Sequence, residues 1–289
     1  MSSRLVIDGG GSAVRARLHG DEVSTVELHE SVNVVTVARS TVGERLGRLL
    51  DRLPPESGAP AMVLAGLAGA GTPSRTADVT SRLRERYPAS LVHVVRDIDL
   101  VVSQLDGPGA ALIVGTGAVA LVPADGAEVL VDGRGFPVGD WGGGAWIGLE
   151  ALRRGLRHHD RIGTSSLLLR SLCVELGLPT DRGVLSALQE DGVLTAQRVA
   201  RLVPTVLRLA VEGDEQAGAV VDAAIKALRD TVVWALRRGG IAGEAQVVVA
   251  GGLVQQGPFR DRLAHSLATS AAVAQLRFVD PLDAAMPSG

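Results

Sequence analysis

The first residues that could carry chemistry lie in RLVIDGGGSAVRARL, residues 4 to 18. An apolar run leads into Asp8, three consecutive glycines and Ser12, and the chain then continues in an alternating pattern. A tight hairpin turn needs only one or two residues of positive φ. Three glycines expose a longer stretch of backbone N–H groups, which suits an anion and most often a phosphate. The alternative interpretation of the same residues is a loose hairpin tip.

The scarcity of two residue types limits the chemistry further. Cys173 is the only cysteine, so the chain cannot form an intrachain disulfide, a cysteine-rich zinc site or an intrachain iron–sulfur site. Lys226 is the only lysine and lies within a helical pattern, so no Walker A lysine follows a glycine loop. If this chain handles nucleotide phosphates, it must use backbone amides, hydroxyl groups, arginines and a metal ion.

The composition sets the class of protein. The 289 residues are 46% hydrophobic and 21% charged, with a net charge of -3. This length suffices for one large domain or two ordinary ones, and the charge balance predicts no nucleic-acid partner. The N-terminus lacks a signal-peptide pattern, and no apolar run approaches the roughly 20 residues that span a bilayer. We therefore expect a cytoplasmic protein with no membrane partner and, from base rates, a homodimer.

The elements that must position these residues follow from apolar spacing. Strands are predicted at 4–7, 13–18, 23–28 and 91–95, and helices at 42–53 and 74–87. Two further buried strands run into glycines, in AMVLAGLAGAG (61–71) and AQVVVAGGLVQQG (245–257).

The strand–glycine–strand pattern of the first hairpin returns in AALIVGTGAVALV, residues 110–122. We interpret this as two α/β halves of like topology that join near residues 104–110, with a helical insertion over 145–238 in the second half. The helices of the insertion are expected to break near Pro179, Gly183, Gly192 and Gly213.

A dinucleotide-binding fold needs Gly-x-Gly-x-x-Gly between a strand and a helix. It is disfavoured because GLAGAGTPS (66–74) has the wrong glycine spacing and GGGSAVRARL (9–18) continues as a strand.

Seven segments resemble one known family in their order along the chain. They are IDGGGS (7–12), SVN (31–33), LAGLAGAG (64–71), VVRDIDLVV (94–102), LIVGTGAVALV (112–122), GRGFPVGDWGGGAWIGLEALR (133–153) and VVVAGGLV (247–254). Together they resemble the N-acetylglucosamine kinase and BadF/BadG/BcrA/BcrD ATPase family, within the superfamily of actin, hexokinase and the heat-shock ATPases. The resemblance implies an α/β fold of two ribonuclease-H-like domains around a central cleft. We expect residues 1–105 to form the first domain and residues 106–289 the second, which carries the helical insertion and the adenosine loop.

The resemblance also implies ATP-dependent phosphorylation of a hydroxyl on an amino sugar, N-acetylglucosamine or a glucosamine-like sugar, with Mg²⁺. Asp97, just past a strand, would take the proton from the attacking hydroxyl and contact the sugar. Its alternative role is the N-cap of a helix that starts at Ile98, and Asp99 is the second choice of base. Asp8 would hold Mg²⁺ through water, and its alternative role is a turn former.

The remaining roles are carried over to matching positions. The ATP-binding residues would be Gly9, Gly10, Gly11, Ser12, Gly115, Thr116, Gly117, Gly251 and Gly252. The last two would let the adenosine approach the backbone closely. Asn33 and Asp140 would contact the sugar, since an amide and a carboxylate suit neighbouring hydroxyls. A helix cap is the alternative role of Asp140.

Four positions depart from the family pattern. Trp141 and Gly143 stand where the family usually has Glu and Ser, and Ala118 and Val119 replace Ser and Asn residues that often touch the sugar. Loss of polar contacts should weaken or redirect sugar binding. The alternative function is therefore a non-catalytic regulatory protein that binds nucleotide or sugar on the same fold. A third option, an ATPase with a subunit-bridging iron–sulfur cluster, is disfavoured because Cys173 is alone.

Overall fold

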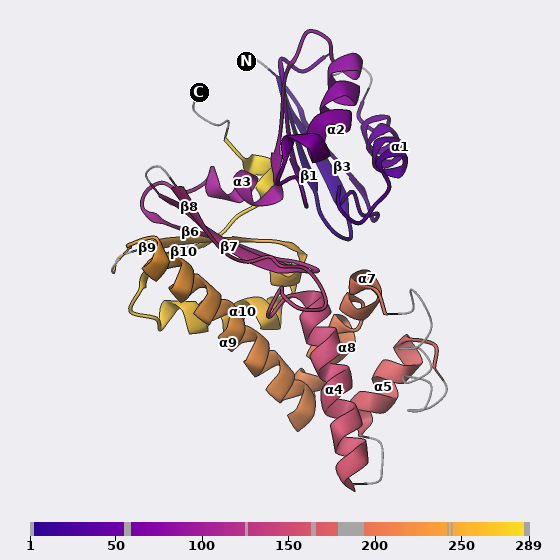
Figure 1. The fold of residues 1–289 in the computed structure, drawn as a ribbon, viewed down its shortest axis with the longest axis vertical. Helices are drawn as coiled ribbons and strands as arrows, with labels where there is room; N and C mark the ends of the chain where they lie inside the picture. Colours follow the sequence, from indigo (N-terminus) through magenta and orange to yellow (C-terminus); the bar gives the residue numbers. More distant parts are fainter. Residues whose placement is uncertain are drawn as a thin grey trace. The chain divides into compact units, whose positions relative to one another are not determined.

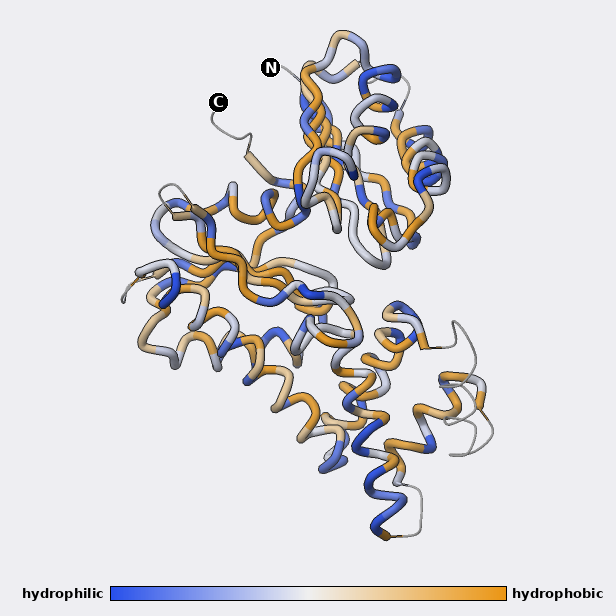
Figure 2. Tube along the Cα trace, viewed as in Figure 1, coloured by the Kyte–Doolittle hydropathy of each residue, from blue (hydrophilic) through white to orange (hydrophobic). Residues whose placement is uncertain are grey.

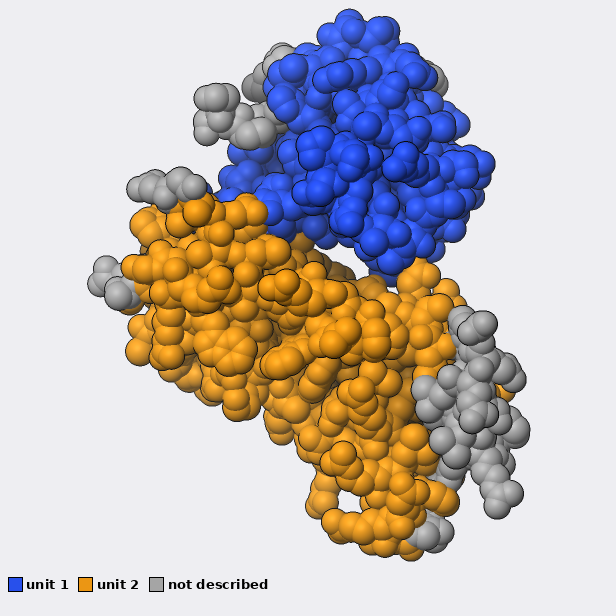
Figure 3. Space-filling model, viewed as in Figure 1, with its two compact units in different colours: residues 1–106, 278–289 blue, residues 107–277 orange. Residues whose placement is uncertain are grey.

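The computed structural model describes residues 3–54, 59–124, 127–162, 166–178, 194–241, 243 and 245–285. The chain divides into two compact units, one of residues 1–106 and 278–289 and the other of residues 107–277 (Figure 3). Each unit is built on a five-stranded sheet with helices packed on it (Figure 1). This arrangement confirms the predicted α/β class.

The sheet of the first unit has the order β3-β2-β1-β4-β5. Its strands are β1 (Arg4–Gly9), β2 (Val14–His19), β3 (Val23–Leu28), β4 (Met62–Leu67) and β5 (Leu91–Arg96). The first three pair antiparallel, whereas β4 and β5 run parallel to β1. The helices of this unit are α1 (Arg39–Leu50), α2 (Pro73–Arg86) and α3 (Asp97–Val102).

The second unit repeats this strand order as β10-β9-β6-β7-β8. Its strands are β6 (Gly109–Val114), β7 (Ala118–Ala124), β8 (Ala127–Asp132), β9 (Ala245–Ala250) and β10 (Val273–Phe278). In both sheets the first strand in sequence is central, with its hairpin partner on one side and the fourth strand parallel on the other. The expected duplication is thereby confirmed at the level of topology.

Helices follow β8 in the position of the predicted insertion. They are α4 (Gly144–Ile162), α5 (Leu167–Glu175), α7 (Ala196–Ala200), α8 (Val203–Val211) and α9 (Glu215–Arg238), and η2 (Gly252–Gln255) and α10 (Gly257–Ala268) come after β9. The predicted helix break at Gly213 is observed, with φ of +92° between α8 and α9. The breaks predicted at Pro179, Gly183 and Gly192 lie outside the described residues.

Two apolar layers enclose the sheet of the first unit. On one face, alternate residues of β1 and β2 pack with α1 and α2, as Ile7, Ala16 and Leu46 show. On the other face, Val6 packs with Leu100 of α3. The strands of both sheets are rich in apolar residues, which appear orange in Figure 2. The alternation of buried and partly buried residues along β2 is what the period-2 pattern of the sequence predicts.

One boundary differs from the sequence expectation, which placed residues 278–289 in the second half. The structure assigns them to the first unit. The reason is the short helix η3 (Pro281–Asp283), whose Leu282 is fully buried in the second apolar layer beside Val6, Leu64 and Leu100. The burial of one large apolar side chain contributes about 1.5 to 3 kcal/mol, enough to attach a short segment to its own unit.

Candidate functional site

The carboxyl ends of three parallel strands gather the candidate residues of the first unit. Asp8 lies opposite Gly66 in the β1–β4 register, and Leu67 lies opposite Arg96 in the β4–β5 register. The glycine turn after β1, the loop after β4 and Asp97 after β5 therefore meet at one sheet edge. Open α/β sheets bind ligands at this edge.

The local geometry favours Asp97 over Asp99 as the reactive carboxylate. Asp99 is occupied by Arg96, which donates from its backbone N–H at 2.9 Å and from its guanidinium at 2.6 and 3.0 Å. Asp97 accepts the backbone N–H of Ile98 at 2.9 Å. The helix α3 begins at Asp97 itself with Arg96 at the N-cap, so Asp97 is not the cap residue that the alternative interpretation required.

The acidity of Asp97 is far from the ordinary value. Burial raises the pKa of Asp97 to about 7, and the nearby negative charges of Asp8 and Asp99 act in the same direction. The N–H of Ile98 opposes this rise. A carboxylate with a pKa near the operating pH is suited to accept a proton from a hydroxyl.

Asp8 is paired with a residue that the sequence interpretation missed. Arg15 lies directly across the β1–β2 ladder from Asp8, and its Nη2 donates to Asp8 Oδ2 at 2.6 Å. Burial raises the pKa of Asp8, and the Arg15 guanidinium opposes that rise. No side-chain hydrogen bond of Asp8 to its own turn is present in the described part of the first unit. The role of turn former therefore receives no support.

The chemistry of Asp8 and Asp97 fits a divalent cation. Each carboxylate is partly buried, and the charge of Asp8 raises the pKa of Asp97, a repulsion that a cation would relieve. Among the described residues, no group of three or more His, Cys, Asp and Glu side chains could hold a metal alone. Proteins usually bind Mg²⁺ through one or two carboxylates together with substrate phosphates, and Asp8 and Asp97 offer two carboxylates.

The first glycine turn is closed by its own backbone. Gly10 N–H donates to Ala13 O at 2.9 Å. A side chain at Gly9 would overlap Leu67 and Val32, so glycine is required there by packing. The turn thus uses one of the N–H groups that the sequence assigned to phosphate.

Asn33 lies beside this turn, in a segment that bridges it to the loop after β4. Val32 N–H donates to Gly10 O, and Val34 N–H donates to Ala68 O. The Asn33 side-chain oxygen accepts the N–H groups of Val35 and Thr36 at 2.9 and 3.3 Å. The amide oxygen therefore holds the loop, which leaves the Nδ2 amide as the group to offer a ligand.

Ser31 anchors the same segment and was not singled out by sequence. It is 3% exposed, its Oγ donates to Gly10 O at 3.4 Å, and it accepts Asn33 N–H at 3.2 Å. A buried serine between two glycine loops connects the turn to Asn33. The signal in the sequence that could have identified Ser31 is its position two residues before Asn33.

The second unit carries an equivalent turn after β6. Gly115 N–H donates to Gly117 O at 2.9 Å, and Gly144 and Ala145, at the start of α4, donate to the carbonyls of Gly115 and Thr116 at 2.8 Å. Within this described turn the N–H groups of Thr116 and Gly117 have no backbone acceptor. These two donors are available to an anion.

The adenosine-loop candidate lies at the same edge of this sheet, since β6 and β9 are parallel neighbours and Ile113 lies opposite Ala250. Gly251 has φ of +115°, and a side chain there would overlap the backbone of Val114. Gly252 has open space where a side chain would begin. Glycine at 251 is therefore explained by the fold, whereas the space at 252 is free for a ligand.

Asp140 is brought directly against the second glycine turn. A side chain at Gly117 would overlap the Asp140 carboxylate. That carboxylate accepts Gly135 N–H at 3.2 Å, and Asp140 itself adopts a left-handed φ of +62°. Burial raises the pKa of Asp140, the N–H of Gly135 opposes this rise, and the charge of Asp132 adds to it. The Asp140 side chain is thus turned toward its own loop and toward Gly117, and not to the cap of α4.

Asp132 holds this arrangement and was missed by the sequence interpretation. Its two carboxylate oxygens accept the N–H groups of Asp140 at 2.7 Å and Trp141 at 2.6 Å. Asp132 also has a left-handed φ of +65°, which aspartate tolerates better than most residues. Only the observed loop conformation reveals the clamp, because β8 ends at Asp132 without a distinctive motif.

The departures from the family pattern have different environments. Ala118 is 3% exposed, so its methyl group is part of the core. Val119 packs where a side chain on Gly133 would stand. Trp141 is 47% exposed, and its indole N–H donates to Val138 O at 3.1 Å. Of these three residues, Trp141 is the one with a large side chain exposed to solvent.

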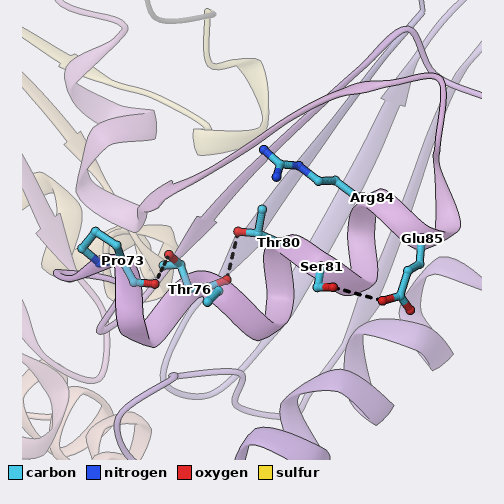
Figure 4. A pocket seen from close by; sticks show the side chains of 7 residues that line it. Pro73, Thr76, Thr80, Ser81, Arg84 and Glu85 are labelled. Carbon is cyan, nitrogen blue, oxygen red and sulfur yellow. Dashed lines mark hydrogen bonds between the residues drawn. The ribbon is translucent and has the colours of Figure 1, made fainter.

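A separate depression lies along α2 and is lined by that helix alone (Figure 4). Its hydroxyl groups donate locally, as Thr76 does to Pro73 O at 3.1 Å and Thr80 to Thr76 O at 2.9 Å. None of the candidate residues lines it. We therefore place the candidate site at the sheet edges and not here.

Comparison with known families decides the classification. The model of the BadF/BadG/BcrA/BcrD ATPase family matches residues 5–275. The chain belongs to the BadF/BadG/BcrA/BcrD ATPase family. The resemblance stated from the seven segments is thereby confirmed, and membership of an ATPase family implies the use of ATP.

Two curated proteins are similar over part of this family member. The N-acetyl-D-glucosamine kinase of Dictyostelium discoideum is 27% identical over 55% of the chain and 51% of its own length. The glucosamine kinase GspK of Vibrio cholerae is 30% identical over 56% of the chain and 57% of its own length. The chain thus matches just over half the length of these curated relatives.

Solved structures share the fold over nearly the whole chain. A protein from Porphyromonas gingivalis provisionally assigned as an N-acetylglucosamine kinase has a TM-score of 0.78 at 17% identity, covering 96% of this chain and 95% of its own. A protein from Chromobacterium violaceum with the same provisional assignment has a TM-score of 0.70 at 22% identity, covering 93% and 98%. These similarities confirm the expected fold of two α/β units.

Proposed function

We propose that the protein phosphorylates a hydroxyl group of an amino sugar, N-acetylglucosamine or a glucosamine-like sugar, with ATP as the phosphoryl donor. The observation that carries the proposal is Asp97, a carboxylate with a pKa of about 7 at the sheet edge that also holds the first glycine turn. Family membership and the names of the two partial curated relatives support the same chemistry.

In the proposed mechanism, Asp97 Oδ accepts the proton of the sugar hydroxyl as that oxygen attacks the terminal phosphorus of ATP. The phosphorus–oxygen bond to ADP breaks, and the phosphate ester forms. Asn33 offers its amide N–H groups to the sugar, and Asp140 offers its carboxylate. Positioning of the two reactants supplies most of the acceleration in such transfers.

Both units supply donors for the nucleotide. The proposed contacts are the backbone and side-chain groups of Gly9, Gly10, Gly11, Ser12, Gly115, Thr116 and Gly117 for the phosphates, with Gly251 and Gly252 for the adenosine. Asp8 would hold Mg²⁺, which neutralises developing negative charge on the phosphates when bound. No helix in the described ranges is long and apolar enough to cross a membrane. We further propose a cytoplasmic homodimer.

The test is ADP release from ATP and Mg²⁺ in the presence of glucosamine, N-acetylglucosamine, N-acetylmannosamine, glucose or no sugar. Turnover with one amino sugar, abolished in Asp97→Asn and retained in the surface control Asp78→Asn, would support the proposal. Binding of ATP and sugar without turnover would favour the non-catalytic alternative, to which the departures at Trp141, Ala118 and Val119 point.

A further inference from the structure

One face of β2 is tied to the segment around η3 by polar contacts. Arg15, Arg17 and His19 alternate along the strand and therefore share a face, opposite to the buried Val14, Ala16 and Leu18. Arg17 donates to Asp280 at 2.9 Å and to Asp283 at 2.6 Å. The His19 ring nitrogen Nε2 lies 2.9 Å from Leu282 O.

Arg15 lies between two carboxylates from distant parts of the sequence. Its Nη2 is 2.6 Å from Asp8 Oδ2 and 3.1 Å from Asp280 Oδ1. Asp8 is the proposed carboxylate for the cation, and Asp280 belongs to the segment around η3. A single guanidinium nitrogen thus connects the two.

Asp280 is itself firmly positioned. Its backbone oxygen accepts Gln104 Nε2 at 2.9 Å, and its Oδ1 accepts Leu282 N–H at 3.1 Å. The fully buried side chain of Leu282 anchors the segment in the apolar layer. Asp280 can therefore retain a guanidinium without moving, at a fixed distance from Asp8.

The Arg15 guanidinium and a divalent cation compete for the Asp8 carboxylate, because both are positive charges bound by the same oxygens. When a cation takes Asp8, the guanidinium of Arg15 needs another acceptor, since a partly buried charge left unpaired is destabilising. Asp280 Oδ1, already within 3.1 Å, provides it.

We propose that Asp280 is a positioning residue that retains the Arg15 guanidinium and thereby leaves Asp8 able to bind a divalent cation. This rests on the proposed function, which assigns the cation to Asp8. Asp280 touches neither the substrate nor the reacting atoms, and it acts only through Arg15.

The experiment measures Mn²⁺ binding by electron paramagnetic resonance in the presence of ADP, with Mn²⁺ as the probe for the Mg²⁺ position. Asp280→Asn keeps the oxygen that caps Leu282 but removes the charge, and we expect Mn²⁺ affinity to fall about 3- to 10-fold. The matched control is Asp283→Asn, because the Asp283 carboxylate pairs with Arg17 and not with Arg15 in the described residues, and we expect wild-type affinity. Circular dichroism and the thermal transition confirm that each variant is folded.

A double-mutant cycle with Arg15→Gln separates the proposed route from a through-space effect of charge. If Asp280 acts through Arg15, the loss caused by Asp280→Asn shrinks to less than about 2-fold in the Arg15→Gln background. Equal losses in both backgrounds, or equal affinities of Asp280→Asn and Asp283→Asn, would overturn the inference while Asp8 kept its role. No Mn²⁺ binding by the wild-type protein would overturn the metal role of Asp8 and this inference together.

Discussion

At the scale of single residues, neighbouring aspartates differ because of their partners. Asp99 accepts three hydrogen bonds from Arg96. Asp97 accepts the N–H of Ile98, and the negative charge of Asp8 raises its pKa. Two carboxylates only two positions apart thus have different chemistry. Asp97, whose carboxylate is not held by the Arg96 guanidinium, is the one suited to accept a proton.

We predict that Asp97→Asn lowers kcat by about 10² to 10⁴ because the amide cannot accept the proton of the sugar hydroxyl. The affinity for ATP should stay within about 2-fold of wild type, since the glycine turns are unchanged. Steady-state kinetics with the sugar identified by the panel, together with calorimetric ATP titration, measure both quantities. Wild-type kcat in this variant would exclude Asp97 as the base.

The raised pKa of Asp97 also predicts a pH dependence of stability in the metal-free protein. A carboxyl whose pKa is raised in the folded state contributes stability that is fully present below about pH 4 and is lost as pH rises through about 7. Asp97→Asn lacks this loss, so its stability relative to wild type should be greater at pH 8 than at pH 5, by at most about 3 kcal/mol.

Urea unfolding followed by circular dichroism at both pH values, with a chelator present, checks this difference. The same stability difference at pH 5 and pH 8 would contradict the assignment of the raised pKa. A variant that loses activity and gains stability would identify a residue held in an unfavourable state for function.

At the scale of elements, the sequence predicted what depends on local patterns. Strands at 23–28 and 91–95, and the glycine runs that follow β1, β4, β6 and β9, could be read from apolar alternation and composition. Parallel strands then place their carboxyl ends at one edge, so the gathering of Asp8 and Asp97 follows from topology. The pairing of Asp8 with Arg15 required the strand register, which composition does not fix.

The clamp of Asp132 on Asp140 and Trp141 was beyond prediction for a different reason. It depends on left-handed φ angles at Asp132 and Asp140, which an aspartate in a sequence indicates far less reliably than a glycine does. The roles of Asn33 and Asp140 came from the family resemblance. Their hydrogen bonds came from the structure.

The two glycines after β9 allow a matched comparison, because the fold requires Gly251 whereas Gly252 is proposed to contact the ligand. Gly251→Ala should destabilise the second unit by about 1 to 3 kcal/mol, because φ of +115° and contact with Val114 both exclude a side chain. Gly252→Ala should leave stability within about 0.5 kcal/mol of wild type and weaken ATP binding, since the added methyl group occupies open space.

Urea unfolding followed by tryptophan fluorescence reports on the second unit alone, because Trp141, Trp146 and Trp234 all belong to it. Calorimetric ATP titration of each variant completes the comparison. If Gly252→Ala bound ATP as tightly as wild type, the adenosine would not contact this glycine.

At the scale of the whole molecule, the first unit is assembled from both ends of the described chain. The contacts of Arg17 with Asp280 and Asp283 join positions more than 260 residues apart. No local pattern in the sequence signals such a pairing, which is why the expected boundary assigned this segment to the other half. The duplicated sheets, in contrast, were visible as repeated strand–glycine–strand patterns.

This arrangement predicts a selective effect of Leu282→Ala. Removal of the buried side chain should destabilise the first unit by about 2 to 5 kcal/mol through the cavity left among Val6, Leu64 and Leu100. Hydrogen exchange should accelerate in β1 and β4 and stay unchanged in β6 and β9. Leu236→Ala, a buried leucine of α9, is the reciprocal control and should accelerate exchange in the second unit instead.

The return of η3 to the first unit also bears on the order of events at the ribosome. The apolar layer around Leu100 is completed only after residues 107–277 have been synthesised. At about 5 to 20 residues per second, this takes on the order of ten to thirty seconds. During that interval Val6, Leu64 and Leu100 lack their last partner on the nascent chain, so the second unit can finish folding before the first and chaperones have a defined surface to protect.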